Sequence, residues 1–94
     1  MWVGTEVQSI LQSKVSSTSI GGTSAGCAVE GNWVYTGENG STTSDDALKN
    51  PYNRQMTFAP ALLNLPFLET FITDTHFVTR DRMGRMLAFT GRII

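Results

Sequence analysis

The stretch Ile20–Cys27, with the sequence IGGTSAGC, places Ser24 between two glycines at the spacing Gly-x-Ser-x-Gly. In one group of hydrolytic enzymes this spacing forms a sharp turn between a strand and a helix, and the turn exposes a nucleophilic serine. Gly22 and Gly26 leave room for such a crowded turn, and the backbone N–H of Ala25 would point at a developing oxyanion. The alternative is an ordinary glycine-rich turn in which Ser24 caps a helix. Taken alone, the motif favours that alternative.

The residues around this stretch predict alternating helices and strands. Apolar residues at helical spacing indicate helices near both ends of the chain, and strict alternation indicates a strand before the last helix. Helices are expected at 5–15, 25–35, 44–50 and 82–93, with Ser44 as an N-cap, and strands at 16–20, 54–59 and 70–78. This order predicts an α/β layer fold. Three strands would leave both sheet edges bare, so the 94 residues are expected to form part of a larger domain that is incomplete at both ends.

Length and composition exclude several classes of protein. The chain has 94 residues, 16% charged residues and a net charge of −1, so it predicts at most one domain and no nucleic-acid-binding surface. Its single cysteine, Cys27, excludes an internal disulfide and a thiolate metal cage. No apolar run is long enough to span a membrane and no signal peptide is recognisable, so the sequence leaves the compartment open. If sheet faces stay uncovered, the isolated chain should be poorly soluble or self-associate.

A serine nucleophile needs a base, and the only histidine is His76, near the end of the predicted strand at 70–78. The carboxyl edge of such strands is where α/β sites form, so His76 and Ser24 are expected to meet there. Arg80, Arg82 and Arg85 follow at once. Arginines near a helix N-terminus oppose the helix dipole, which suggests that they form an anion-binding pocket; the alternative is a solvated helix start with local ion pairs.

The segments IGGTSAGCAVEG (residues 20–31) and TDTHFVTRDRMGRMLAF (residues 73–89) together resemble the cyanophycinase and peptidase E family of serine peptidases. The intervening ENGSTTSDDALKNPY (residues 38–52) is similar to the cyanophycinase-like branch of that family. The resemblance extends over most of the chain, from about Trp2 to Ile94. It implies a three-layer fold with a mostly parallel sheet and flanking helices, like that of class I glutamine amidotransferases.

The resemblance also implies roles for individual residues. Ser24 would be the nucleophile, His76 the general base, and Asp74, Arg82 and Arg85 would line the substrate pocket. The implied activity is hydrolysis of peptide bonds next to aspartyl residues, in cyanophycin or in other aspartyl peptides, without a metal or cofactor. The family's third catalytic residue, a glutamate, and its glycine-rich oxyanion segment have no counterpart in this sequence. The acid is expected beyond Ile94, so the chain alone should have little activity, since losing a triad acid lowers turnover about 10⁴-fold.

Two alternatives remain open at this stage. The chain could be a binding or scaffold protein that keeps the fold and an arginine-lined anion pocket without catalysis. It could also be a thiol enzyme that uses Cys27, although a small core residue is the better interpretation of that cysteine because no cationic residue neighbours it in sequence.

Overall fold

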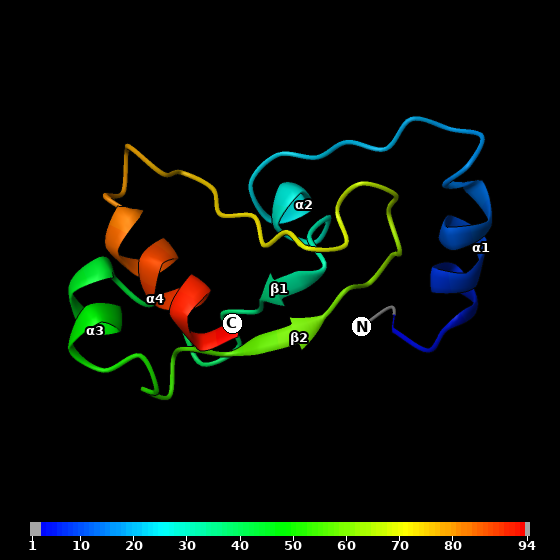
Figure 1. The fold of residues 1–94 in the computed structure, drawn as a ribbon. Coiled ribbons are helices and arrows are strands. Elements are labelled where there is room, and N and C mark those ends of the chain that lie inside the picture. Colours follow the sequence, from blue (N-terminus) through cyan, green and yellow to red (C-terminus); the bar gives the residue numbers. More distant parts are fainter. Residues whose placement is uncertain (1–2, 94) are drawn as a thin grey trace.

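Among residues 3–93, which the computed structural model describes, four helices surround a two-stranded sheet (Figure 1). The short strands and α2 lie at the centre, α3 and α4 pack together at one end, and α1 lies at the other. The elements in chain order are α1 (Glu6–Lys14), α2 (Ala25–Ala28), β1 (Trp33–Tyr35), α3 (Ser44–Lys49), β2 (Phe58–Pro60) and α4 (Met83–Ile93).

The sheet corrects the predicted fold class. Strands β1 and β2 pair antiparallel, with Trp33 opposite Pro60 and Tyr35 opposite Phe58. The only parallel pairing within residues 3–93 is an isolated bridge between Trp33 and Ile72. The prediction of a three-layer fold with a mostly parallel sheet is therefore wrong: the described chain has a small antiparallel hairpin-like sheet with helices around it.

The predicted strand at 70–78 fails because its backbone groups bond elsewhere. Only Ile72 pairs with a strand residue. The Asp74 carboxylate accepts a hydrogen bond from the Thr75 N–H, and His76 has a φ of 53°, which no extended strand adopts. The predicted strand at 16–20 is also absent; its residues are exposed and in turn or irregular conformation. Serine and threonine side chains compete for backbone hydrogen bonds, which weakens such a segment as a strand.

The predicted helix at 25–35 is split. Helix α2 ends at Ala28, and the aromatic and β-branched residues that follow form β1. Between them lies Gly31, where an added Cβ would come within 3.0 Å of the Phe71 and Trp33 carbonyl oxygens. Only glycine lets these two backbone segments approach so closely. The strand predicted at 54–59 forms only at its end, as β2.

The core lies between α3, α4 and the sheet. Ala47, Met56, Ala88 and Phe89 are its buried apolar residues, and Phe89 is fully enclosed. The Phe89 ring stacks on Tyr35 with centroids 4.7 Å apart and meets the Phe58 ring edge-on. This aromatic cluster joins α4 to both strands, and such pairs stabilise by about 0.5–1.5 kcal/mol beyond their area burial.

Helices α3 and α4 meet through small residues. Thr43, one residue before the predicted cap, accepts a hydrogen bond from the Asp46 N–H at the start of α3. Ser44 instead accepts from the Arg85 N–H and donates to the Asp81 carbonyl, so it caps the start of the neighbouring α4. A Cβ on Gly84 would lie 2.8 Å from Leu48 and Ser44 side-chain atoms. Gly84 thus serves the contact between the helices.

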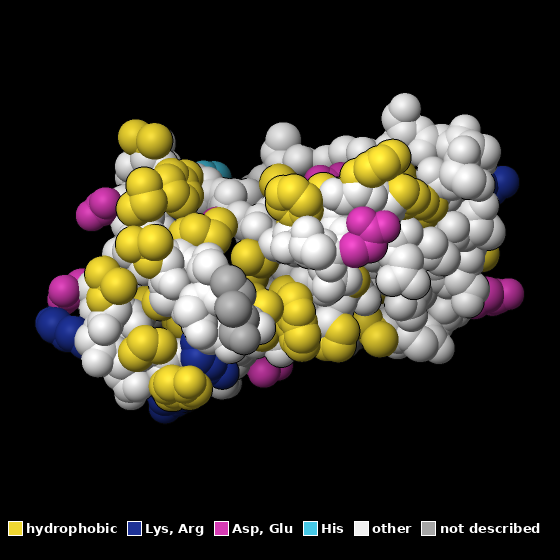
Figure 2. Space-filling view, viewed as in Figure 1, with side chains coloured by type: hydrophobic (Ala, Val, Ile, Leu, Met, Phe, Trp, Pro, Cys, Tyr) yellow, Lys and Arg dark blue, Asp and Glu magenta, His cyan; other side chains and the backbone are white. Residues whose placement is uncertain are grey.

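Much apolar side chain remains at the surface. Helix α1 has no buried residue, and Val7 and Ile10 on it are exposed, as are Met83 and Leu87 on α4. Figure 2 shows hydrophobic side chains spread over the face that carries α4 and the centre of the molecule. Self-association of the chain stays a prediction. Within residues 3–93 no helix has the length and apolar character needed to cross a membrane.

Candidate functional site

The turn at Ser24 has the strained geometry that the sequence motif predicts. Ser24 has φ 52° and ψ −122°, a conformation that L-residues rarely adopt, and α2 begins at the next residue. The Ala25 N–H has no acceptor among residues 3–93, whereas the Gly26 N–H donates to the Thr23 carbonyl. The turn thus presents an exposed serine side chain beside a backbone donor that is available to a ligand.

Close packing inside the turn explains one of the two motif glycines. A Cβ on Gly22 would lie 2.4 Å from the carbonyl carbon of Gly26, far inside van der Waals contact. A Cβ on Gly26 would meet nothing within 4 Å. The prediction that the turn needs a residue without a side chain at both positions is therefore confirmed for Gly22. It is wrong for Gly26, where the methyl group of an alanine would fit.

This difference gives a matched pair of variants. Gly22→Ala is expected to destabilise the fold by about 1–3 kcal/mol, because backbone must move to admit the methyl group. Gly26→Ala should leave stability unchanged or raise it by up to about 1 kcal/mol, because alanine is the better helix former. Urea denaturation followed by circular dichroism measures both. Equal effects of the two substitutions would contradict this geometry of the turn.

The side chains of Ser24 and His76 meet, as the sequence predicts. They do not meet at the carboxyl edge of parallel strands, because neither residue directly follows a strand in the structure. Ser24 Oγ lies 2.9 Å from His76 Nε2, a hydrogen-bond distance between residues 52 positions apart. His76 is exposed and has a φ of 53°, so both residues of the pair sit in backbone conformations that glycine favours. With Nε2 facing the hydroxyl, the tautomer protonated on Nδ1 would accept the serine proton. No residue in the described part of the chain accepts a hydrogen bond from Nδ1.

Three hydrogen bonds hold the histidine segment against α2 and the start of β1. The Phe71 carbonyl accepts hydrogen bonds from the Asn32 and Trp33 N–H groups, at 2.7 and 3.4 Å. The Thr73 hydroxyl donates to the Cys27 carbonyl at 2.9 Å, at the end of α2. Since α2 begins directly after Ser24, these contacts fix the position of His76 relative to Ser24.

Asp74 and Arg85 form a buried ion pair. Arg85 Nε donates to Asp74 Oδ2 at 2.7 Å and its Nη2 donates to Oδ1, so the contact is bidentate. Arg85 Nη1 donates to the Ser41 hydroxyl and the Thr42 carbonyl. The guanidinium also lies over the Tyr35 ring at 4.9 Å. Both side chains are only 4% exposed, and every guanidinium nitrogen of Arg85 has a partner within the protein.

Arg82 is buried as well. Its Nη1 donates to the Thr75 carbonyl at 2.7 Å and lies 3.8 Å from Asp74 Oδ1. Burial, and next the positive charge of Arg85, lower the pKa of the Arg82 guanidinium, and the Asp74 carboxylate partly offsets this. The three residues assigned to a substrate pocket thus lie together beside His76, but Asp74 and Arg85 bond to each other and Arg82 bonds to backbone. The Asp74 carboxylate offsets part of the positive charge that the two arginines place beside the start of α4.

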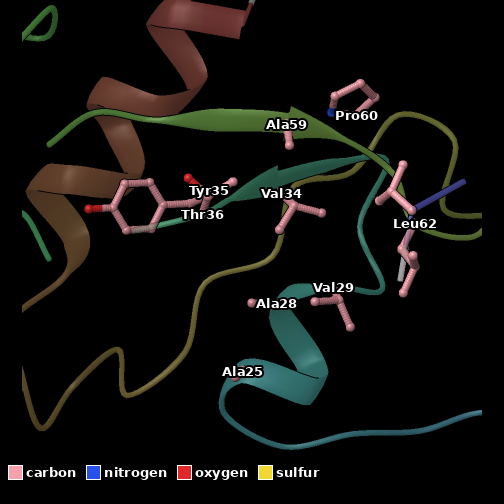
Figure 3. Close-up of a pocket in the computed structure, with 10 residues that line it drawn as sticks. Ala25, Ala28, Val29, Val34, Tyr35, Thr36, Ala59, Pro60 and Leu62 are labelled. Carbon is pink, nitrogen blue, oxygen red and sulfur yellow. The ribbon is translucent and has the colours of Figure 1, made fainter. Parts of the chain in front are cut away.

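An apolar cavity, not foreseen from the sequence, opens between α2 and the two strands (Figure 3). Its volume is about 470 Å³, and Ala25, directly after the nucleophile candidate, is part of its wall. No charged side chain lines it, so it suits an apolar group better than a carboxylate. The lining residues are Val3, Ala25, Ala28, Val29, Val34, Tyr35, Thr36, Ala59, Pro60 and Leu62. Four separate segments build this wall, namely Val3 and residues 25–29, 34–36 and 59–62, so no local sequence pattern signals it.

Cys27 is half-buried and lies within α2 rather than at the turn. The expectation that it is a buried core residue is not met, because the core cluster consists of Ala47, Met56, Ala88 and Phe89. Among residues 3–93, no three His, Cys, Asp or Glu side chains gather closely enough to hold a metal ion.

No protein-family model, curated protein or solved structure matches this chain. The resemblance to cyanophycinase and peptidase E therefore stays a prediction from the two sequence segments that carry it.

Proposed function

We propose that the chain carries the nucleophile and the general base of a serine-type hydrolase, Ser24 and His76. The observation that carries the proposal is the 2.9 Å contact between Ser24 Oγ and His76 Nε2. A serine on a strained turn and the only histidine of the chain reach hydrogen-bond distance from segments far apart in sequence. Nucleophile and base within such a distance are the signature of covalent catalysis by serine.

The proposed reaction is acyl transfer. His76 Nε2 takes the proton from Ser24 Oγ as the oxygen attacks the substrate carbonyl, and the oxyanion that forms accepts a hydrogen bond from the Ala25 N–H. The imidazolium then returns the proton to the leaving group as the bond to that group breaks. A water molecule, deprotonated by the same imidazole, releases the acyl group from Ser24. The proposal needs no metal or cofactor.

The rate of this reaction should be low in the chain as described. Without an acceptor at His76 Nδ1 among residues 3–93, the tautomer that can accept the serine proton is not fixed. Removing the acid that accepts this hydrogen bond from a serine enzyme with a complete triad lowers turnover by about 10⁴-fold. Covalent labelling of Ser24, which needs only the first half of the reaction, is therefore the more sensitive measurement.

For the substrate we propose the class that the resemblance implies, peptides with aspartyl residues. With Asp74, Arg82 and Arg85 bonded within the protein, another group would have to hold the substrate carboxylate. Paired substrates address this: a peptide with aspartate before the scissile bond, the same peptide with asparagine, and a p-nitrophenyl ester of a short fatty acid. Preference for the aspartyl peptide would support the peptidase, and preference for the ester would point to the apolar cavity as the acyl site.

The test of the hydrolase itself is reaction of the 94-residue chain with a fluorophosphonate, followed by mass spectrometry of the digested protein. The expected result is one adduct, on the peptide that contains Ser24, lost in Ser24→Ala. It should persist in Ser9→Ala, which removes an exposed serine of α1, and in Cys27→Ala. An unlabelled, folded wild-type protein would overturn the proposal and favour a binding protein. Loss of labelling in Cys27→Ala alone would indicate a thiol nucleophile.

A further inference from the structure

Arg82 holds the backbone on both sides of the histidine. Its Nη1 donates to the carbonyl oxygen of Thr75 at 2.7 Å, and its backbone N–H donates to the carbonyl oxygen of Phe77 at 2.8 Å. Thr75 and Phe77 are the residues before and after His76. The Arg82 side chain is buried, so its hydrogen bond to Thr75 is shielded from competing water.

The peptide segment between these two carbonyls needs such support. His76 has a φ of 53°, a conformation that is unfavourable for a residue other than glycine and persists only where the surroundings fix it. No strand pairs with residues 75–77 in the described chain. The direction of the His76 side chain follows from the backbone on either side of it. The Arg82 side chain fixes the peptide plane before His76 through the Thr75 carbonyl, and its backbone N–H fixes the peptide that follows Phe77; the His76 carbonyl itself accepts from the Arg80 N–H and the Thr79 hydroxyl.

We propose that Arg82 is a positioning residue, which aligns the His76 imidazole with Ser24 by bonding the carbonyls of the residues before and after it, with the side-chain bond to Thr75 fixing the peptide plane that precedes His76. The inference rests on the proposed hydrolase function. It assigns Arg82 a role different from the substrate binding that the resemblance implies. A group that binds the substrate carboxylate acts only on charged substrates, whereas a group that orients the base acts on every substrate, including a neutral one.

Labelling with a small, uncharged phosphonate ester separates the two roles. Arg82→Met removes the hydrogen bond to Thr75 and is expected to slow labelling of Ser24 at least tenfold. Arg82→Lys keeps a donor on a chain that reaches nearly as far, and should recover most of the rate. The matched control is Arg92→Met: Arg92 lies on the same helix and also donates to a backbone carbonyl, that of Pro51 at 2.6 Å, far from Ser24 in sequence. It should label at the wild-type rate.

The single histidine provides a second readout that does not require activity. At pH 8.5, the ¹⁵N shifts of the imidazole show which nitrogen carries the proton. In the wild type, Nε2 facing the Ser24 hydroxyl predicts protonation on Nδ1. In Arg82→Met we expect shifts that move toward those of free imidazole, and in Arg82→Lys a return toward the wild type. Arg82→Gln, whose amide ends two atoms short, replaces the methionine variant if circular dichroism shows that Arg82→Met is unfolded.

The outcomes separate this inference from the proposed function. Unchanged labelling and unchanged imidazole shifts in a folded Arg82→Met protein would overturn the positioning role and leave the hydrolase standing. A wild-type protein that is not labelled would overturn the hydrolase, and the imidazole shifts would still decide whether Arg82 orients His76. Slower cleavage of aspartyl peptides with unchanged labelling by the neutral probe would return Arg82 to the role of a substrate ligand.

Discussion

Replacing His76 with glutamine is expected to slow fluorophosphonate labelling of Ser24 by about 10²–10⁴-fold, the contribution typical of a general base. Glutamine keeps a polar side chain of similar reach but cannot take the proton from Ser24 Oγ. The measurement is the second-order rate constant of labelling at several pH values. The pH dependence that the general base gives to this rate in the wild type should be absent in His76→Gln.

Stability controls accompany this experiment. Because His76 is exposed and contacts Ser24 at the surface, His76→Gln should unfold at nearly the wild-type urea concentration. A folded variant that labels at the wild-type rate would show that His76 does not act as the base. The 2.9 Å contact would then be a surface hydrogen bond without a chemical role.

The second large effect is expected at the buried ion pair. Arg85→Met should lower the free energy of unfolding by about 3–5 kcal/mol, because the Asp74 carboxylate would stay buried without its bidentate partner, and Arg82 lies 3.8 Å away with its nearest nitrogen bonded to Thr75. The change also removes the donors to Ser41 and Thr42 and the contact with the Tyr35 ring. For a domain of this size such a loss is a large part of the total stability.

A double variant and an exposed pair make this prediction specific. In Asp74→Asn combined with Arg85→Met the buried carboxylate no longer carries a charge, so part of the lost stability should return. Lys49→Met breaks the ion pair with Asp45, which is equally short at 2.7 Å but exposed, and should hardly move the urea midpoint. An Arg85→Met protein as stable as Lys49→Met would contradict the assignment of Asp74 and Arg85 as a buried pair.

The parts of this structure that follow from the sequence are those fixed by local signals. The first and last helices appear as expected because apolar residues recur at helical spacing at both ends of the chain. The strained turn at Ser24 follows from Gly22 and from the start of a helix at Ala25. The pairing of Ser24 with His76 could be expected because the chain offers one histidine only.

The strands could not be predicted, since long-range contacts decide them. The alternation of residue types at 70–78 is compatible with a strand. It is equally compatible with an irregular segment whose polar groups face the arginines at the start of α4. In the structure Arg82 binds the Thr75 carbonyl and Arg85 binds the Asp74 carboxylate. The sequence predicts that Arg82 and Arg85 bind a substrate, because the spacing of residues along the chain does not reveal a partner within the protein. Only the fold brings Asp74 within reach of Arg85, eleven residues later.

Two backbone segments cross closely at Gly31, and the contact between Ser24 and His76 depends on the number of residues between this crossing and each of the two side chains. Extended backbone advances about 3.3 Å per residue. If Phe71 slipped by one residue against Asn32, His76 would be displaced by about that step, which exceeds the 2.9 Å between its Nε2 and Ser24 Oγ, and the contact would be lost. A single-residue deletion between 72 and 75 is therefore as harmful to the pair as loss of the imidazole. Length changes at the exposed tip of the loop at 37–40 leave that register intact.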